Sequence, residues 1–265
     1  MSSRERDLAR IRDALHAASK ALQRHLGAPI EYTIKHGHGP VTAADHELDA
    51  LLRTTLPEPG EGWLSEETVD DAARLSCRRV WIVDPIDGTR SLVAGRPEYS
   101  ISIALVEDGE PVLGGVCNPA SGVTVVGGPD VGLTVEGAPK LSFPGRGCSG
   151  ALRVLASRSE CRSGEWDSWL SSGEVDVLPI SSVAYKLALV AAGFADATWT
   201  VWPKSEWDVA AGMALVRASG GAVWAPGVTA PRLNRPDPRF RGFGGAGASC
   251  LERVRNVLAD GIPPR

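Results

Sequence analysis

The sequence predicts a layered α/β protein, built as one large domain or as two lobes. A long helical pattern opens the chain and is followed by a block of short strand patterns. From about residue 150 onward, strand and helix patterns alternate, which is typical of α/β architecture. With 265 residues, 43% of them hydrophobic, the chain can bury a substantial core.

The first part of the chain predicts helices followed by a largely antiparallel sheet. Apolar residues recur at helical spacing from Leu8 to Leu26, so we expect an amphipathic helix there. A second helix is expected from Thr42 to Leu56, because Pro57 and Pro59 end it. Strand patterns separated by Gly and Pro turns cover residues 80–84, 99–106, 111–117, 122–126 and 131–135. Such a succession of short strands favours a meander.

The second part predicts a smaller α/β lobe. Expected strands cover residues 152–156, 175–178 and 195–201, and expected helices cover 165–170, 183–192, 205–218 and 249–258. The segment 226–241 is rich in Pro and Arg and is expected to be a loop. Gly145 to Gly150 is the expected seam, which divides the chain into lobes 1–147 and 148–265.

Composition argues against a nucleic acid or a membrane as partner and favours a cytoplasmic protein. A net charge of −4 and a pI near 5.8 argue against a nucleic acid polymer as partner. No apolar run approaches the length of about 18 residues needed to span a membrane, and residues 1–26 lack the apolar core of a signal peptide. The five cysteines are scattered and show no C-x-x-C spacing, which favours reduced thiols over disulfides or structural zinc.

The segment from Trp81 to Thr89 is the most informative motif. Its apolar start predicts a buried strand, which Pro85 should end near Asp84 because proline cannot donate a ladder hydrogen bond. Asp87-Gly88 favours a turn, and free N–H groups from Gly88 onward could open a helix. Two carboxylates beside a helix N-terminus suit a divalent metal ion together with a phosphate group.

The motif Asp-Pro-Ile-Asp-Gly-Thr at residues 84–89 resembles the core motif of the inositol monophosphatase superfamily, whose members are magnesium-dependent, lithium-sensitive phosphatases. Three further segments, 41–45, 64–67 and 206–212, match that superfamily in the expected order. The resemblance implies an αβαβα sandwich, a small phosphate ester as substrate and, because relatives are commonly homodimers, a possible homodimer.

The resemblance also implies a set of metal ligands. Glu66, Asp84 and the backbone carbonyl of Ile86 would hold a first Mg²⁺ ion, and Asp84, Asp87 and Asp208 would hold a second. A third, weaker ion would share Glu66 and water. Ions about 3.5–4 Å apart need a bridging carboxylate such as Asp84. Taken alone, Asp87 would be better explained as a turn residue or helix cap, and Asp208 could also be a favourable charge in the first turn of a helix.

Two readings exist for Asp45. Thr42 and Asp45 match the [ST]-x-x-[DE] pattern of a helix capping box. In the superfamily, the matching aspartate instead accepts a hydrogen bond from the threonine at the position of Thr89, which helps orient or deprotonate the attacking water. We expect Asp45, Thr89 and Glu66 to be catalytic, and Asp87, Gly88 and Thr89 to contact the phosphate, since Gly88 lets it approach the backbone closely.

Two other motifs are weaker. His36-x-His38 offers a metal pair, but without further ligands a loop is the simpler interpretation. Residues 242–247 satisfy G-x-G-x-x-G, but they lie too near the C-terminus to be followed by a βαβ unit and an acid about 20 residues onward. We therefore reject a dinucleotide site there.

The substrate is less clearly indicated. Inositol monophosphatases carry an acid shortly before the Trp-Asp motif, and the corresponding segment 199–204 has none. Arg90, Ser182 and Lys186 instead resemble the 3′(2′),5′-bisphosphate nucleotidase branch, in which Arg90 and Lys186 could bind a second phosphate. The alternatives are ordinary ion pairs for these cations, an inositol or fructose-1,6-bisphosphate substrate, and a metal-dependent regulatory protein without turnover.

Overall fold

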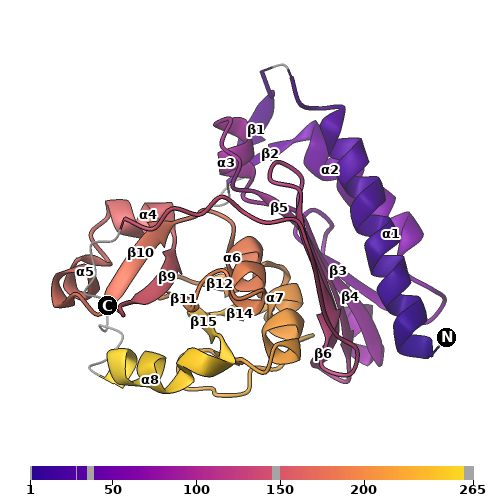
Figure 1. The fold of residues 1–265 in the computed structure, drawn as a ribbon. Coiled ribbons are helices and arrows are strands. Elements are labelled where there is room, and N and C mark those ends of the chain that lie inside the picture. The colour runs from indigo at the N-terminus through magenta and orange to yellow at the C-terminus, as the bar shows by residue number, and fades with distance from the viewer. Residues whose placement is uncertain (1, 28, 35–38, 145–149, 260–265) are drawn as a thin grey trace.

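The computed structural model describes residues 2–27, 29–34, 39–144 and 150–259, and these fold into five alternating layers of helices and sheets (Figure 1). The order of the layers is αβαβα, as the resemblance implied, so the predicted fold class is confirmed. Within the described residues, every helix is too short or too polar to cross a bilayer.

The first outer layer consists of α1 (Ser3–Gln23) and α2 (Ala43–Thr55), which pack on a six-stranded sheet. The strands follow one another in chain order: β3 (Gly62–Ser65), β4 (Arg79–Asp87), β5 (Ser100–Glu107), β6 (Glu110–Asn118), β7 (Val123–Gly128) and β8 (Gly132–Glu136). Only the β3–β4 pair is parallel, so the expected antiparallel meander forms from β4 onward.

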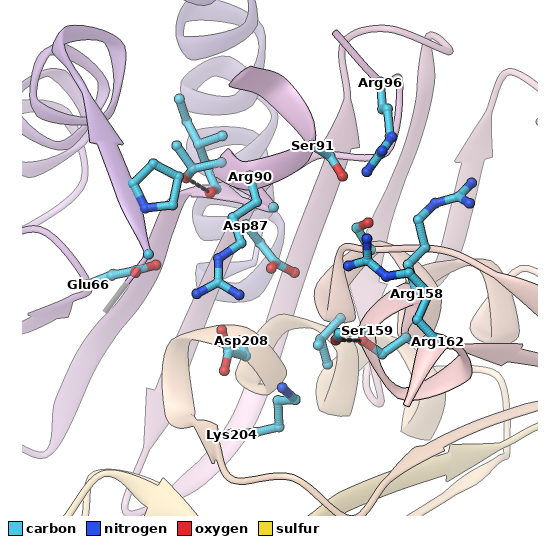
Figure 2. Close-up of a pocket in the computed structure, with 18 residues that line it drawn as sticks. Glu66, Asp87, Arg90, Ser91, Arg96, Arg158, Ser159, Arg162, Lys204 and Asp208 are labelled. Atoms are coloured by element: carbon cyan, nitrogen blue, oxygen red, sulfur yellow. Dashed lines mark hydrogen bonds between the residues drawn. The ribbon is translucent and has the colours of Figure 1, made fainter. Parts of the chain in front are cut away.

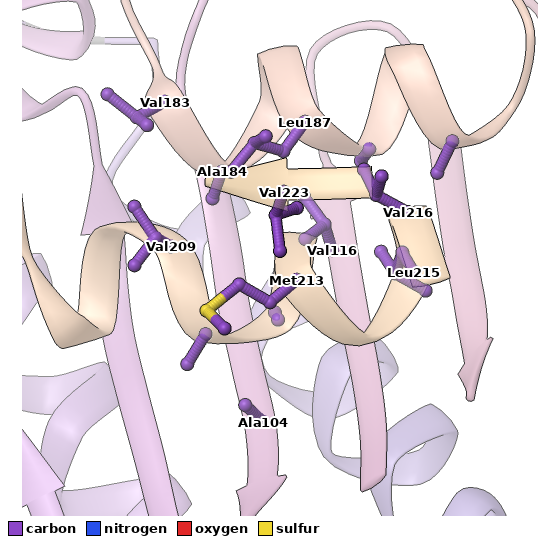
Figure 3. Close-up of a cluster of buried hydrophobic side chains, with 14 of the residues drawn as sticks. Ala104, Val116, Val183, Ala184, Leu187, Val209, Met213, Leu215, Val216 and Val223 are labelled. Atoms are coloured by element: carbon purple, nitrogen blue, oxygen red, sulfur yellow. The ribbon is translucent and has the colours of Figure 1, made fainter. Parts of the chain in front are cut away.

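The middle layer is formed by α6 (Val183–Ala191) and α7 (Glu206–Ala218), which lie between the two sheets (Figures 1 and 3). Strand β4 is buried on both faces for this reason. Trp81 and Val83 pack with α1 and α2, whereas Val80 and Ile82 pack with the middle helices. The apolar run that predicted a central strand is therefore explained by cover on two sides.

The second sheet has five strands in the order β10-β9-β11-β15-β13. Their bounds are β9 (Leu152–Ala156), β10 (Val175–Pro179), β11 (Ala197–Thr200), β13 (Ala222–Trp224) and β15 (Phe243–Ala246). Helices α5 (Asp167–Ser172) and α8 (Leu251–Ala259) contribute to the core on the face away from α6 and α7. Trp166, Trp169 and Trp199 stack there with ring centroids 4.9–5.5 Å apart.

Short elements complete the described chain. They are the hairpin of β1 (Tyr32–Ile34) and β2 (Pro40–Thr42), the pair β12 (Lys204–Ser205) and β14 (Arg239–Phe240), the helices α3 (Thr89–Val93) and α4 (Arg158–Arg162), and the 3₁₀ turns at Ala72–Ser76 and Ala248–Cys250. The predicted loop 226–241 is thus interrupted by β14.

The expectation that β4 ends near Asp84 is wrong. The strand continues to Asp87, but its register with β5 shifts between Asp84 and Asp87, so Pro85 and Ile86 lie in an irregularity of the ladder. Proline is tolerated there because no ladder hydrogen bond is required of it.

Most of the glycine-rich segment 242–247 forms β15 (Phe243–Ala246), which lies in the interior of the second sheet. A Cβ atom on Gly244 would lie 2.3 Å from the Trp224 ring, so glycine is required by packing. Rejecting a dinucleotide loop is consistent with this arrangement.

Two predictions cannot be compared with the structure. Most of the Gly145–Gly150 seam and the His36-x-His38 pair lie outside the described residues. The division into lobes 1–147 and 148–265 stays a prediction.

Candidate active site

Three carboxylates from two distant parts of the chain meet in one cleft. Asp84 and Asp87 come from the end of β4, and Asp208 lies in the first turn of α7. One oxygen from each lies within 4.8 Å of the others. The cleft has a volume of about 300 Å³, and Glu66, which follows β3, also lines it (Figure 2). The structure therefore brings four of the predicted acidic ligands to one place.

These acids strongly perturb one another. Burial raises the pKa of Asp84 well above its usual range, and the negative charges of Glu66, Asp87 and Asp208 raise it further. Burial together with the charge of Asp208 raises the pKa of Asp87 to about 6. Burial also raises the pKa of Asp208, although Lys204 opposes the shift. A cation bound among these carboxylates would favour their ionised forms.

The geometry of Asp84 fits a bound cation. Its Oδ1 accepts a hydrogen bond from the Ile86 N–H at 3.0 Å, while its Oδ2 is buried with no hydrogen-bond partner among the described residues. A buried carboxylate oxygen left without a donor is costly unless a cation binds it. Clustered carboxylates are also the hard oxygen ligands that Mg²⁺ prefers. The residues present therefore fit the metal centre that the sequence predicts.

Asp87 is held by the start of α6. Its Oδ2 accepts hydrogen bonds from the Ser182 hydroxyl and from the Ala184 N–H, both at 2.7 Å. Ser182 is the N-cap residue of that helix and also lies 2.9 Å from the Ser100 hydroxyl. The middle helical layer thus fixes the orientation of a carboxylate that belongs to the first sheet.

Asp45 makes both of the contacts that the two interpretations of the sequence predict. Its Oδ2 accepts hydrogen bonds from the Thr42 N–H at 2.8 Å and from the Thr42 hydroxyl at 2.6 Å, which completes a capping box at the start of α2. Its Oδ1 faces the Thr89 hydroxyl at 3.0 Å. Thr89 Oγ1 is also 2.9 Å from the Ile86 carbonyl oxygen. One hydroxyl proton therefore has two acceptors, and both belong to predicted site residues.

Gly88 connects β4 to α3 in a conformation that requires glycine. Its φ of 99° lies in the left-handed region, and a Cβ atom would lie 2.8 Å from the Glu98 carbonyl oxygen. A side chain at this position would therefore strain the turn that places Asp87 and Thr89 at the cleft.

The opposite side of the cleft is positively charged. Figure 2 shows Arg96, Arg158 and Arg162 on the side of the cleft away from Glu66 and Asp208, with Arg90 and Lys204 nearer to the carboxylates. Within the described part of the chain, Arg90, Arg96 and Arg162 form no ion pair, whereas Arg158 is paired with Glu98. The cleft thus has an acidic half, in which Arg90 and Lys204 lie beside the carboxylates, and a basic half that contains Arg96, Arg158 and Arg162.

Comparison with known proteins identifies the family of this chain. The model of the inositol monophosphatase family matches residues 5–240. The chain belongs to the inositol monophosphatase family.

Relatives within the family carry different activities in their names. The chain is 34% identical over 241 residues to the 3′(2′),5′-bisphosphate nucleotidase CysQ of Salmonella typhimurium, covering 86% of this chain and 95% of the relative. It is 33% identical over 220 residues to the inositol-1-monophosphatase of Mesorhizobium japonicum, covering 78% and 80%. A crystal structure of CysQ from Bacteroides thetaiotaomicron superposes with a TM-score of 0.75 at 27% identity, covering 91% and 97%. Membership of this family identifies the chain as a phosphatase.

Two predicted substrate residues of this family member lie elsewhere than expected. Lys186 is only 1% exposed and is not among the residues that line the cleft. Burial lowers its pKa to about 8, opposed by the negative charge of Glu160. Ser182 is fully buried behind Asp87. Because neither side chain reaches the cleft surface, their positions differ from the expected contact with substrate, whereas Arg90 does line the cleft.

Sequence reasoning missed most of the basic half. Arg96, Arg162 and Lys204 lie in loops or short elements that carry no recognised motif, so only their positive charge distinguishes them. Lys204 stands just ahead of the Trp-Asp motif, where inositol monophosphatases were expected to carry an acid. The nearby Glu206 points away, because it accepts hydrogen bonds from the backbone N–H groups of residues 234 and 235.

Proposed function

We propose that this protein is a Mg²⁺-dependent phosphatase that hydrolyses a nucleoside 3′(2′),5′-bisphosphate. The observation that carries the proposal is the division of the cleft into an acidic half, which suits metal ions, and a basic half, which suits an anion on the substrate. A substrate with one phosphate at the metal centre and a second on the same sugar would use both halves.

The proposed metal ligands are those predicted from the sequence. Glu66, Asp84 and the Ile86 carbonyl would hold one Mg²⁺, and Asp84, Asp87 and Asp208 would hold a second. The proximity of Asp84, Asp87 and Asp208 and the unpartnered oxygen of Asp84 support this assignment. When bound, Mg²⁺ supplies the positive charge that acidifies a water molecule and neutralises the phosphoryl oxygens.

The side chains around Thr89 are proposed to orient the attacking water. When the Thr89 hydroxyl donates a hydrogen bond to Asp45 Oδ1, the lone pairs of its oxygen are free to accept a hydrogen bond from water. Asp45 is itself fixed by its bonds to Thr42. Water aligned in this way would attack phosphorus opposite the ester oxygen, so that the new P–O bond forms as the ester P–O bond breaks. The water would pass a proton by way of Thr89 to Asp45, and the departing alkoxide would take a proton from solvent. The backbone at Gly88 and Thr89 is proposed to contact the phosphoryl group.

The basic half supports the preference for a bisphosphate. Arg90 and Lys186 were predicted to bind the second phosphate, and of the two only Arg90 lines the cleft. Arg96 and Arg162 add two guanidinium groups that lack an ion-pair partner within the described residues. The similarity to a bisphosphate nucleotidase over 95% of its length agrees with this preference.

A panel of substrates tests the proposal. We expect Mg²⁺-dependent release of phosphate from 3′-phosphoadenosine 5′-phosphate with kcat/KM at least tenfold higher than for adenosine 3′-phosphate, inositol 1-phosphate or fructose 1,6-bisphosphate. The Asp87→Asn variant should lose nearly all turnover and keep its circular dichroism spectrum, while the exposed-site control Asp237→Asn should behave as wild type.

Preference for inositol 1-phosphate would instead make the protein an inositol monophosphatase, and near-normal turnover by Asp87→Asn would refute the metal assignment. Lithium sensitivity, cytoplasmic location and a homodimer stay predictions.

A further inference from the structure

A second cavity of about 620 Å³ lies beside the cleft, and three chain segments contribute to both. Arg96 lines the cleft and the adjacent Pro97 and Glu98 line the second cavity. Ser181 lines the cleft and the preceding Ile180 lines the second cavity. Arg158 lines both. The two spaces are therefore neighbours on one surface.

An ion pair lies where the two spaces adjoin, because Arg158 lines both and Glu98 lines the second. The Arg158 Nε donates to Glu98 Oε2 at 2.5 Å, and its Nη2 pairs with Glu98 Oε1. The Ser181 hydroxyl also donates to Glu98 Oε2, at 3.3 Å. A molecule that reaches past Arg158 from the cleft would therefore enter the second cavity directly.

The second cavity has a different chemical character from the cleft. Much of its wall is made of aliphatic, proline and aromatic side chains: Pro97, Ala120, Pro139, Leu141, Leu178, Ile180 and Tyr185. Its buried polar groups already bind one another. The Tyr185 hydroxyl lies 3.1 Å from the Ser121 hydroxyl, and the Asn118 amide bonds the Pro97 carbonyl and the N–H groups of residues 120 and 121. Such a wall suits a flat apolar ring rather than a phosphate.

The cleft itself has little space for such a ring. At about 300 Å³ it lies at the lower end of the usual range for ligand pockets, about 300–1,000 Å³. Metal ions with their waters and two phosphate groups would occupy most of that volume. The second cavity has about twice the volume.

We propose that this second cavity binds the nucleobase of the substrate, with the Glu98–Arg158 pair forming the boundary between the phosphate and base subsites. The proposal rests on the function proposed above and adds a residue-level basis for choosing nucleotides over compact sugar phosphates.

A cavity-filling variant tests the base subsite. Ala120 is exposed and lines the cavity, so Ala120→Trp should fill part of it without disturbing the core. We expect KM for 3′-phosphoadenosine 5′-phosphate to rise at least tenfold, while KM for the base-free analogue methyl riboside 3,5-bisphosphate and kcat for both compounds stay within twofold of wild type. Leu75→Trp, at a partly exposed site in another pocket, is the matched control and should change neither KM.

Binding measurements separate this proposal from the proposed function. Titration calorimetry with the same two bisphosphates in Ca²⁺ does not depend on turnover, and Ala120→Trp should weaken binding of the nucleotide alone. Equal weakening of both compounds, or no weakening of either, would overturn the base subsite. If the wild type hydrolyses neither bisphosphate, the proposed function fails instead. Should Ala120→Trp misfold, Ser142→Trp at the exposed rim of the cavity takes its place under the same criteria.

Discussion

Ser182 connects three parts of the molecule through one hydroxyl group. The group accepts from the Tyr185 N–H as a helix cap, lies against the Ser100 hydroxyl and donates to Asp87. Because a hydroxyl has one proton, donation to Asp87 requires that Ser100 donate to Ser182. Ser182 is thus suited to orient a metal ligand, which is a different role from the substrate contact predicted from the sequence.

Replacing Ser182 with alanine separates these two roles. Loss of the donor to Asp87 should lower the affinity for Mg²⁺ or Ca²⁺ about 10- to 100-fold, the range seen when groups behind metal ligands are removed. The substrate KM at saturating Mg²⁺ should stay near the wild-type value. Titration calorimetry with Ca²⁺ measures the first quantity, and Ser219→Ala is the control. A raised KM with unchanged metal affinity would favour the substrate contact instead.

The sequence predicted which residues belong to the candidate site better than it predicted how deeply each is buried and what it contacts. Asp84, Asp87, Asp208 and Glu66 could be identified because each lies in a motif, and the structure brings them to one cleft. The burial of Lys186 could not be predicted, because a lysine on an otherwise apolar helix is compatible both with contact to a ligand and with burial in the interior. The pairing of Arg158 with Glu98, 60 residues away, leaves no local signal in the sequence.

Helix α7 begins at a buried acid that is not part of the metal centre. Glu206 is fully buried and accepts hydrogen bonds from the N–H groups of Asn234 at 2.7 Å and Arg235 at 3.1 Å. Burial raises its pKa from 4.5 to about 7, although these bonds oppose the shift. The helix that carries Asp208 is thereby tied to the loop before β14.

The raised pKa of Glu206 predicts a specific dependence of stability on pH. The folded state binds the proton more tightly than the unfolded state, so this stabilisation is complete below pH 4.5 and is lost as the pH rises through about 7. The free energy of unfolding of the wild type, measured relative to Glu206→Gln, should therefore fall by up to about 3 kcal/mol between pH 4.5 and pH 8.

Urea denaturation of both proteins in saturating Mg²⁺ measures this difference, because other titrating groups largely cancel. A difference that does not change with pH would contradict the assignment.

Long elements were predictable and short ones were not. Helices at 43–55, 183–191 and 206–218 match their expected ranges closely because their apolar periodicity is long enough to read. Strands β3, β13 and β15 were missed, since each has three or four residues and β15 contains two glycines. These segments are strands because they pair with neighbouring strands in the folded protein, and a local sequence pattern does not contain that information.

The candidate metal site joins elements that are distant along the chain. Ligands after β3, at the end of β4 and at the start of α7 meet only when the first sheet and the middle helices are packed. Metal binding should therefore be linked to folding of the whole molecule.

We expect Mg²⁺ at 100 times its dissociation constant to raise the free energy of unfolding by about 2.7 kcal/mol. For a protein of this size, each kcal/mol of added stability raises Tm by about 2–4 °C. Thermal unfolding in Mg²⁺ and in EDTA measures the shift, and it should largely disappear in Asp208→Asn. An equal shift in that variant would place the stabilising ion elsewhere.

The order of layers could not be obtained from periodicity alone. Local patterns indicated where helices and strands lie, but the arrangement of two sheets around a shared pair of helices came from the resemblance to a family. Val116 of the first sheet and Val223 of the second illustrate the reason, because both belong to the core cluster around α6 and α7 (Figure 3). Contacts of this kind join residues more than 100 positions apart.

The shared middle layer has a consequence for the evolution of the chain. The two sheets share the helices that cover their inner faces. A gene fragment that encodes the first sheet alone would therefore leave Ile82, Ala104 and Val116 facing water. Such a half could not have served as an independent ancestral unit without a substitute for α6 and α7. Loss or exchange of those two helices would expose the inner faces of both sheets at once.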